Sequence, residues 1–381
     1  MKVVLFCHSI ASCWNHGNAH FLRGVARELI RLGNQVVVHE PADGWSRTNL
    51  LQDHGAAALQ EGSRVVPGVD MRTYSHKAAD VDEMLDGANL VLVHEWTDPA
   101  LVSEIGRRRI RGGHFLLLFH DTHHRAVTAP HEIERFDLEG YDAVLAFGEV
   151  LRQVYVVRGW GRRAFTWHEA ADATLFRPNP SAHKDTDLIW IGNWGDGERD
   201  DELQGFLIEP VAALGLTARI HGVRYPQAIR ARLNDHGIQY SGWLPNHRVP
   251  EAFARARVTV HIPRRPYVET LWGIPTIRMF EALACGIPLV SAPWHDVEGL
   301  FPSGAYMTAR NTQEMIAMVE LTLRDPTFAM EVARAGAQCI QARHTCRHRV
   351  EQLLEISDGL GTAAVPAVRD DQWQTEKVAA T

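Results

Sequence analysis

Residues 261–293 read HIPRRPYVETLWGIPTIRMFEALACGIPLVSAP, and this stretch decides the fold. It predicts a strand end that carries two arginines, then a loop, a short helix and another buried strand. Pro275 suits the first helical position, where no N–H is needed, and Gly286 suits the C-terminal stop. Arg278 and Glu281 are three residues apart, so their side chains lie on the same side of the helix.

The start of this helix has the chemistry of a nucleoside diphosphate site. A helix N-terminus offers free N–H groups and partial positive charge to a phosphate, and Thr276 stands at that position. Arg278 adds a planar fork for phosphate oxygens, and Glu281 can accept hydrogen bonds from ribose hydroxyls. The alternative is an ordinary surface ion pair between these two side chains.

The same helix resembles the donor-binding helix of GT-B glycosyltransferases, in particular the group-1, family 4-like (GT4-like) type and its spore-maturation (CgeB-like) branch. The resemblance rests on Gly-Ile-Pro at 273–275 and on Phe-Glu-Ala-Leu-Ala-Cys-Gly-Ile-Pro-Leu-Val at 280–290. It implies that Glu281 contacts the donor ribose. Many family-4 enzymes carry a second glutamate eight residues earlier, and this chain has Gly273 there, so the paired motif is half present.

Length and composition limit the classes of protein that need to be considered. A chain of 381 residues fits two domains, and 22% charged and 45% hydrophobic residues are typical of a globular protein. The net charge of -7 argues against general binding of nucleic acid or anionic membranes. Five scattered cysteines without a C-x-x-C pair favour the cytoplasm, and no apolar run approaches the ~20 residues of a membrane span.

The N-terminal residues predict a β-α-β unit with strands at 3–6 and 36–38. Glu40 ends the second strand, where a dinucleotide-binding fold would place its ribose-binding acid. However, the loop after the first strand lacks a G-x-G-x-x-G motif, which weighs against an NAD enzyme without removing it as an alternative. The resemblance implies instead that this loop faces the acceptor, through Asn15, His16, Gly17 and Asn18.

Polar clusters follow three predicted strands at 90–93, 115–119 and 143–146. Ligands of open α/β sheets bind beyond the carboxyl ends of the strands, so these clusters are expected at one rim. The resemblance implies that His120 lies near the donor sugar and the acceptor, with Asp121 orienting it or acting as a base.

His94 and Glu95 are candidate acceptor-side partners, and the alternative for them is a strand-end hydrogen-bonded pair. The histidines at 120–124 also raise the question of a metal site. Their spacing does not support one, so no metal is expected. Solvent-facing loop histidines are the remaining alternative.

A second α/β unit begins with a predicted strand at 188–191 and a glycine-rich turn, whose N–H groups can hold a phosphate. The resemblance implies that this turn and the loops after the following strands meet the donor. The candidates in these loops are Gly192, Asn193, Gly195, Arg199, Arg224, Trp243 and Arg264. Trp243 is the candidate for the nucleobase, with a core role as the alternative, and a solvated basic turn is the alternative for Arg264.

The sequence therefore predicts an α/β protein of the GT-B class, with two Rossmann-like doubly wound domains facing each other across a cleft. The expected parts are an acceptor-binding domain at 1–165, a linker at 166–187, a donor-binding domain at 188–344, a helix at 345–358 that returns to the first domain, and a mobile tail at 359–381.

The expected activity is metal-independent transfer of a sugar, such as a hexose, from a UDP, GDP or dTDP sugar to the hydroxyl of a small molecule or glycan. No further cofactor, nucleic-acid partner or integral membrane segment is expected, and a homo-oligomer is left open. The alternatives are a nucleotide-sugar epimerase of the same fold and a non-catalytic nucleotide-sugar-binding protein.

Overall fold

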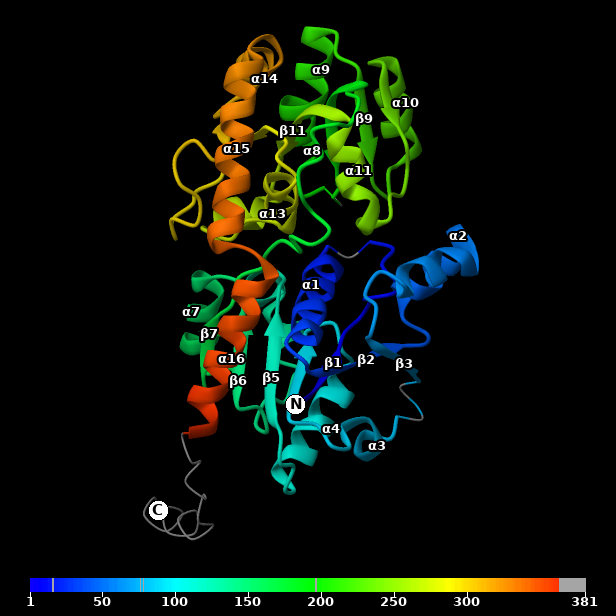
Figure 1. Ribbon diagram of the computed structural model, residues 1–381, viewed down its shortest axis with the longest axis vertical. Coiled ribbons are helices and arrows are strands. Elements are labelled where there is room, and N and C mark those ends of the chain that lie inside the picture. The colour runs from blue at the N-terminus through cyan, green and yellow to red at the C-terminus, as the bar shows by residue number, and fades with distance from the viewer. Residues whose placement is uncertain (16, 76, 78, 196, 363–381) are drawn as a thin grey trace, which may run out of the picture.

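The computed structural model describes residues 1–362 except 16, 76, 78 and 196. Figure 1 shows two lobes stacked along the long axis, each built on a parallel sheet with helices packed around it. Within the described residues, no helix combines the length and the apolar character that crossing a membrane requires.

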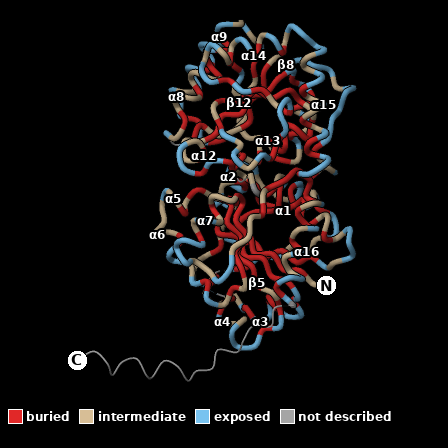
Figure 2. Tube along the Cα trace, turned by 90° about the vertical axis from the view of Figure 1, so that its left-hand side faces the viewer, coloured by how far each residue is buried: buried red, intermediate tan, exposed pale blue. Residues whose placement is uncertain are grey.

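The N-terminal lobe contains a seven-stranded sheet in the order β3-β2-β1-β4-β5-β6-β7. Its strands are β1 Lys2–Phe6, β2 Gln35–Pro41, β3 Asp70–Tyr74, β4 Leu90–His94, β5 Leu116–Asp121, β6 Ala143–Ala146 and β7 Ala164–Thr166. Its helices are α1 Asn18–Arg31, α2 Trp45–Ser63, α3 Val81–Leu85, α4 Pro99–Ile110, α5 Arg125–Thr128, α6 Pro130–Ile133 and α7 Glu149–Arg158. The central strands are mostly apolar because helices cover both faces of the sheet, and Figure 2 shows them buried.

The C-terminal lobe contains a six-stranded sheet in the order β10-β9-β8-β11-β12-β13. Its strands are β8 Thr186–Ile191, β9 Ala218–His221, β10 Ile238–Tyr240, β11 Ala256–His261, β12 Leu289–Ser291 and β13 Met307–Thr308. Its helices are α8 Asp200–Leu203, the π-helix η1 Gln204–Ile208, α9 Glu209–Leu214, α10 Gln227–Asp235, the 3-10 helix η2 Asn246–Arg248, α11 Val249–Ala254, α12 Arg265–Glu269, α13 Ile277–Ala284, α14 Thr312–Arg324 and α15 Pro326–Arg343. The expected loop before α13 includes the short helix α12, which sequence periodicity did not reveal.

The last helix, α16 Cys346–Thr362, leaves the C-terminal lobe and packs on α1 and β5 of the N-terminal lobe (Figure 1). A Cβ on Gly24 of α1 would lie 2.3 Å from the Cys346 sulfur, so only glycine allows the two helices to approach this closely. The helix continues to Thr362, and the expected tail at 359–381 is therefore helical in its first four residues. Residues 363–381 lie outside the described residues.

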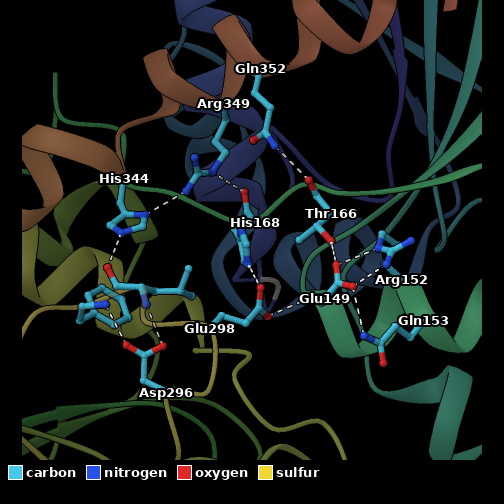
Figure 3. Close-up of polar contacts among 12 residues, drawn as sticks. Glu149, Arg152, Gln153, Thr166, His168, Asp296, Glu298, His344, Arg349 and Gln352 are labelled. Carbon is cyan, nitrogen blue, oxygen red and sulfur yellow. Dashed lines mark hydrogen bonds and ion pairs between the residues drawn. The ribbon is translucent and has the colours of Figure 1, made fainter.

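Polar contacts fix the segment that joins the lobes, as Figure 3 shows. The His168 Nε2 lies 2.8 Å from the Glu298 Oε2, and the other Glu298 oxygen accepts from the Glu149 N–H at 2.9 Å. The Arg349 Nε donates to the His168 carbonyl oxygen at 3.0 Å, and an Arg349 Nη lies 2.9 Å from the His344 Nδ1. The lobes are thus held by side chains from the linker, from the loop after β12 and from α16.

One apolar core extends through both lobes. It joins Leu5 and Phe21 of the N-terminal lobe to Ile277, Phe280 and Leu283 on one face of α13. The helix that the sequence singled out therefore lies where the lobes meet.

Candidate functional site

Two cavities lie next to each other between the lobes, with volumes of about 630 Å³ and about 120 Å³. Residues from both lobes line each of them. The residues that line both cavities are Asn15, Gly17, Ile191, Gly192, Asn193 and Arg278. The cavities are therefore adjoining compartments of one site, which an elongated ligand can occupy.

The smaller cavity has a largely apolar wall built by Val223, Trp243, Leu244 and Val249. Trp243 stacks on His54 of α2, with ring centroids 4.1 Å apart, so this wall is completed from the other lobe. A flat aromatic ring of a ligand fits such a wall.

The larger cavity has a positively charged edge in the C-terminal lobe. Arg199, Arg224, Arg264 and Arg278 line it, next to Thr276 at the N-cap of α13. The first N–H groups of a helix have no partner within the helix, and the helix dipole adds positive charge there. This edge is suited to a phosphate group.

Contacts within the protein hold the Arg199 side chain in place at this edge. Its Nη atoms donate to the carbonyl oxygens of Ile262 at 3.0 Å and Asn193 at 2.6 Å, and its guanidinium lies 5.1 Å from the Trp190 ring centroid. Among the described residues, its buried Nε has no hydrogen-bond partner. Burial, assisted by Arg264, lowers the pKa of Arg199 to about 10, which leaves it charged at neutral pH.

The backbone of the neighbouring loops also approaches this edge closely. A Cβ on Gly222 would lie 2.0 Å from the Gly192 carbonyl oxygen, so the loops after β8 and β9 can meet only through glycine. Arg224 has a φ of 61°, in the left-handed region, where any residue other than glycine is strained. Gly195, another expected donor residue, does not line either cavity, and a Cβ there would contact the Arg199 side chain.

Glu281 does not reach the cavities, where a contact with the donor ribose was expected. Its side chain is fully buried and lines neither cavity. Arg278 forms an ion pair with it, the Asn246 Nδ2 donates to it at 2.7 Å, and the His20 Nδ1 lies 3.3 Å from it. Glu281 therefore fixes the position of Arg278, which lines both cavities, through a contact on the buried side of that arginine.

The expected catalytic pair also lies away from both cavities. His120 and Asp121 have no exposed surface, because the last residues of β5 remain inside the sheet. Asp121 accepts hydrogen bonds from the Tyr155 hydroxyl at 2.7 Å and from the His123 N–H at 3.0 Å. His120 packs against Trp167 with ring centroids 4.8 Å apart, and neither of its nitrogens has a hydrogen-bond partner among the described residues. This placement corrects the expectation that the two side chains face the ligand.

The burial of His120 leads to a pH-dependent prediction. Burial lowers its pKa to about 3, whereas an unfolded histidine titrates near 6.5. The unfolded chain therefore binds one more proton between these values, and the stability associated with neutral His120 is lost as the pH falls from about 6.5 towards 3.

We expect His120→Phe to remove this dependence. The difference in unfolding free energy between variant and wild type should grow in favour of the variant by about 1.4 kcal/mol per pH unit below pH 6. Urea unfolding from pH 6.5 to 4.5 measures it. A difference that stays constant with pH would show that His120 is accessible to protons.

His94 and Glu95 are likewise buried, and neither lines a cavity. The His94 Nε2 lies 3.0 Å from the Thr122 hydroxyl, and Glu95 forms an ion pair with Arg125. Burial raises the pKa of Glu95 to about 8, against the opposing effect of Arg125. The two side chains thus contact other residues, Thr122 and Arg125, and Arg125 lines the larger cavity.

The loop at 15–18, which was expected to face the acceptor, reaches both cavities. Asn15 and Gly17 line both cavities, and His16 lies outside the described residues. Asn18 begins α1, and its side chain is also outside the described part. The Asn193 amide donates to the Asn15 side chain across the lobes, so the loop and the glycine-rich turn meet over the site.

Several cavity residues had no assigned role in the sequence interpretation. They are Trp45, Trp96, Thr122, His123, His124, Arg125, Glu169, Glu198 and Tyr267. The sequence signal for residues 122–125 was the polar run that begins at the end of β5. The residues of this run that lie beyond the strand line the cavity, whereas His120 and Asp121, which belong to the strand, do not. Across the described residues, no group of three or more His, Cys, Asp or Glu side chains is placed to hold a metal ion.

Comparisons with known proteins agree with this architecture. Residues 199–355 match the family model described as glycosyl transferase-like. No curated protein matches the chain by sequence.

Among solved structures, the chain is similar to sucrose-phosphate synthase from Thermosynechococcus elongatus, with a TM-score of 0.65, 13% identity, and coverage of 96% of this chain and 100% of the other. Anabaena HepE in complex with UDP gives a TM-score of 0.65 and 16% identity over 94% of this chain and 100% of the other. T4 phage BGT in complex with UDP-glucose gives a TM-score of 0.58 and 12% identity over 95% and 99% of the two chains. The chain therefore has the GT-B fold, and its residues 199–355 are similar to the glycosyl transferase-like family.

Proposed function

We propose that the protein is a glycosyltransferase that uses a UDP-sugar as donor. The observation that carries the proposal is the pair of adjoining cavities, in which a compartment with an apolar wall at Trp243 leads to four arginines and the N-terminus of α13. Along a nucleotide sugar, the nucleoside is followed by the diphosphate and then by the sugar. The wall at Trp243 and the arginines follow one another in the matching order. Two structural relatives, HepE and T4 phage BGT, have been crystallised with UDP-glucose, which supports UDP as the first nucleotide to test.

The chemistry requires stabilisation of the leaving group. When the bond between the sugar C1 and the β-phosphate oxygen breaks, negative charge develops on the diphosphate. Arg199, Arg264 and Arg278 are positioned to stabilise that charge together with the α13 N–H groups, so the residues of the chain can supply this electrostatic contribution.

The acceptor side of the larger cavity is formed by the N-terminal lobe. Trp45 and Trp96 offer apolar surface for the ring of a glycan or small molecule. His124 lies between the lobes, with its Nδ1 2.8 Å from the Thr128 hydroxyl and its buried Nε2 without a hydrogen-bond partner among the described residues. Burial lowers the pKa of His124, so its neutral imidazole can accept the proton of the attacking hydroxyl, the role of base that was first considered for Asp121.

Release of free nucleoside diphosphate tests the proposal. The protein should release UDP from UDP-glucose or another UDP-hexose, slowly with water and faster with a hydroxyl-bearing acceptor. EDTA should leave the rate unchanged. Absence of release from UDP, GDP and dTDP sugars, with and without acceptors, would contradict a transferase.

Trp243 provides a test of the nucleobase compartment. Trp243→Ala removes the aromatic wall and its stacking partner for a base, so we expect UDP to bind about 10-fold to 100-fold more weakly. Calorimetric titration measures this, with inorganic pyrophosphate as the control ligand whose weak binding should not change. An unchanged UDP affinity would assign Trp243 to packing against His54 alone.

A further inference from the structure

Glu169 carries a buried carboxyl group with an oxygen that no described residue hydrogen-bonds. It lies in the segment between β7 and β8, and its side chain lines the larger cavity. The residue is only 3% exposed, and its Oε1 has no hydrogen-bond partner among the described residues. A buried polar atom without a hydrogen-bond partner is uncommon in native proteins, and binding of a ligand is one explanation for it.

The backbone around Glu169 is held firmly. The Trp167 Nε1 donates to the Arg349 carbonyl oxygen at 2.8 Å, and His168 is fixed by Glu298 and Arg349 (Figure 3). The Ala171 N–H donates to the His344 carbonyl oxygen at 2.9 Å. Because residues on both sides of Glu169 are anchored, the backbone holds the origin of this side chain beside the cavity.

The surroundings of Glu169 indicate which part of a donor it would meet. Thr276, Ile277 and Arg278 line the same cavity and form its anion-binding edge. Arg278 is close enough to lower the pKa of Glu169, although burial and the neighbouring Glu281 raise it more strongly. A group next to the diphosphate, on the side of the larger cavity, is the transferred sugar.

Position 273, shortly before α13, carries no carboxyl group. Gly273 has a φ of +88°, and a Cβ there would lie 2.7 Å from the Val297 Cγ2. A side chain at 273 would therefore strain the backbone and require Val297 to shift. A sugar hydroxyl can both donate and accept, so it satisfies the Glu169 carboxyl in either protonation state.

We propose that Glu169 is a sugar-specificity residue, which binds a hydroxyl group of the hexose carried by the nucleotide donor. The proposal rests on the proposed function and deepens it. The segment between β7 and β8 would then supply, through Glu169, a contact with the donor that Gly273 does not supply.

Calorimetric titration of UDP and UDP-glucose into the full-length wild type, Glu169→Ala and Glu169→Gln tests this assignment. We expect Glu169→Ala to weaken UDP-glucose binding about tenfold while UDP affinity stays within about twofold. Glu169→Gln retains hydrogen-bonding atoms and should lose less. UDP serves as the matched control, since it differs from UDP-glucose only in lacking the sugar.

Thermal unfolding without ligand separates this role from a structural one. Because no hydrogen bond to the Glu169 Oε1 is found within residues 1–362 as described, Glu169→Ala should melt at or above the wild-type temperature. Equal weakening of both ligands, or unchanged binding of both, would overturn the assignment to the sugar while leaving the proposed function in place. Failure of the wild type to bind either ligand would overturn both.

Discussion

Replacing Arg278 with alanine is expected to lower kcat/KM for the UDP-sugar by about 10²-fold to 10³-fold. Arg278 is the charged side chain that lines both cavities, and it stands at the N-terminus of α13, where the diphosphate is proposed to bind. Loss of one preorganised electrostatic group at a developing negative charge has an effect of this size. Initial rates of UDP release measure it.

The control for this experiment is Arg310→Ala. Arg310 pairs with Glu314 on the surface, as Arg278 pairs with Glu281, but its side chain is 85% exposed. Its removal should leave kcat/KM unchanged. Equal activity of the Arg278→Ala variant and the control would exclude Arg278 from the donor site.

Glu281→Ala is expected to reduce the free energy of unfolding by about 3–5 kcal/mol. Its buried carboxylate is shared by Arg278, Asn246 and His20, and its removal leaves these groups without their partner. Breaking a buried charge pair by removing one partner is costly for this reason. Urea unfolding measures the loss.

Glu314→Ala serves as the comparison, because loss of its solvent-screened pair with Arg310 should leave the free energy of unfolding nearly unchanged. The outcome also decides between two roles for Glu281. Wild-type stability combined with weakened UDP binding would mean that Glu281 contacts the ribose directly. A large loss of stability supports its position behind Arg278.

The class of fold could be predicted because its signals are local. Apolar runs of strand length, helices between them and the start of α13 each follow from short segments of sequence. The spacing of Arg278 and Glu281 correctly placed the two side chains on one side of the helix. It could not reveal that His20 from α1 and Asn246 from η2 cover Glu281, because these contacts come from distant parts of the chain.

The site was harder to predict at the strand ends. A strand boundary uncertain by one or two residues decides whether a side chain lies in the core or in the cavity. His120 and Asp121 are still within β5, whereas His123 and His124 lie beyond it and line the cavity. Glu169 had no sequence signal, since its importance arises from the anchored backbone on either side and from the lack of a partner.

Thermal unfolding in the presence of UDP, GDP, dTDP, CMP and NAD, for wild type and Arg278→Ala, tests the central claim most directly. A ligand at about 100 times its dissociation constant adds about 2.7 kcal/mol to the stability of the folded state. The account predicts a rise of a few degrees in wild-type melting temperature with UDP, and its loss in Arg278→Ala. A rise with NAD alone, or a UDP-dependent rise that persists without Arg278, would contradict a nucleoside diphosphate site at the start of α13.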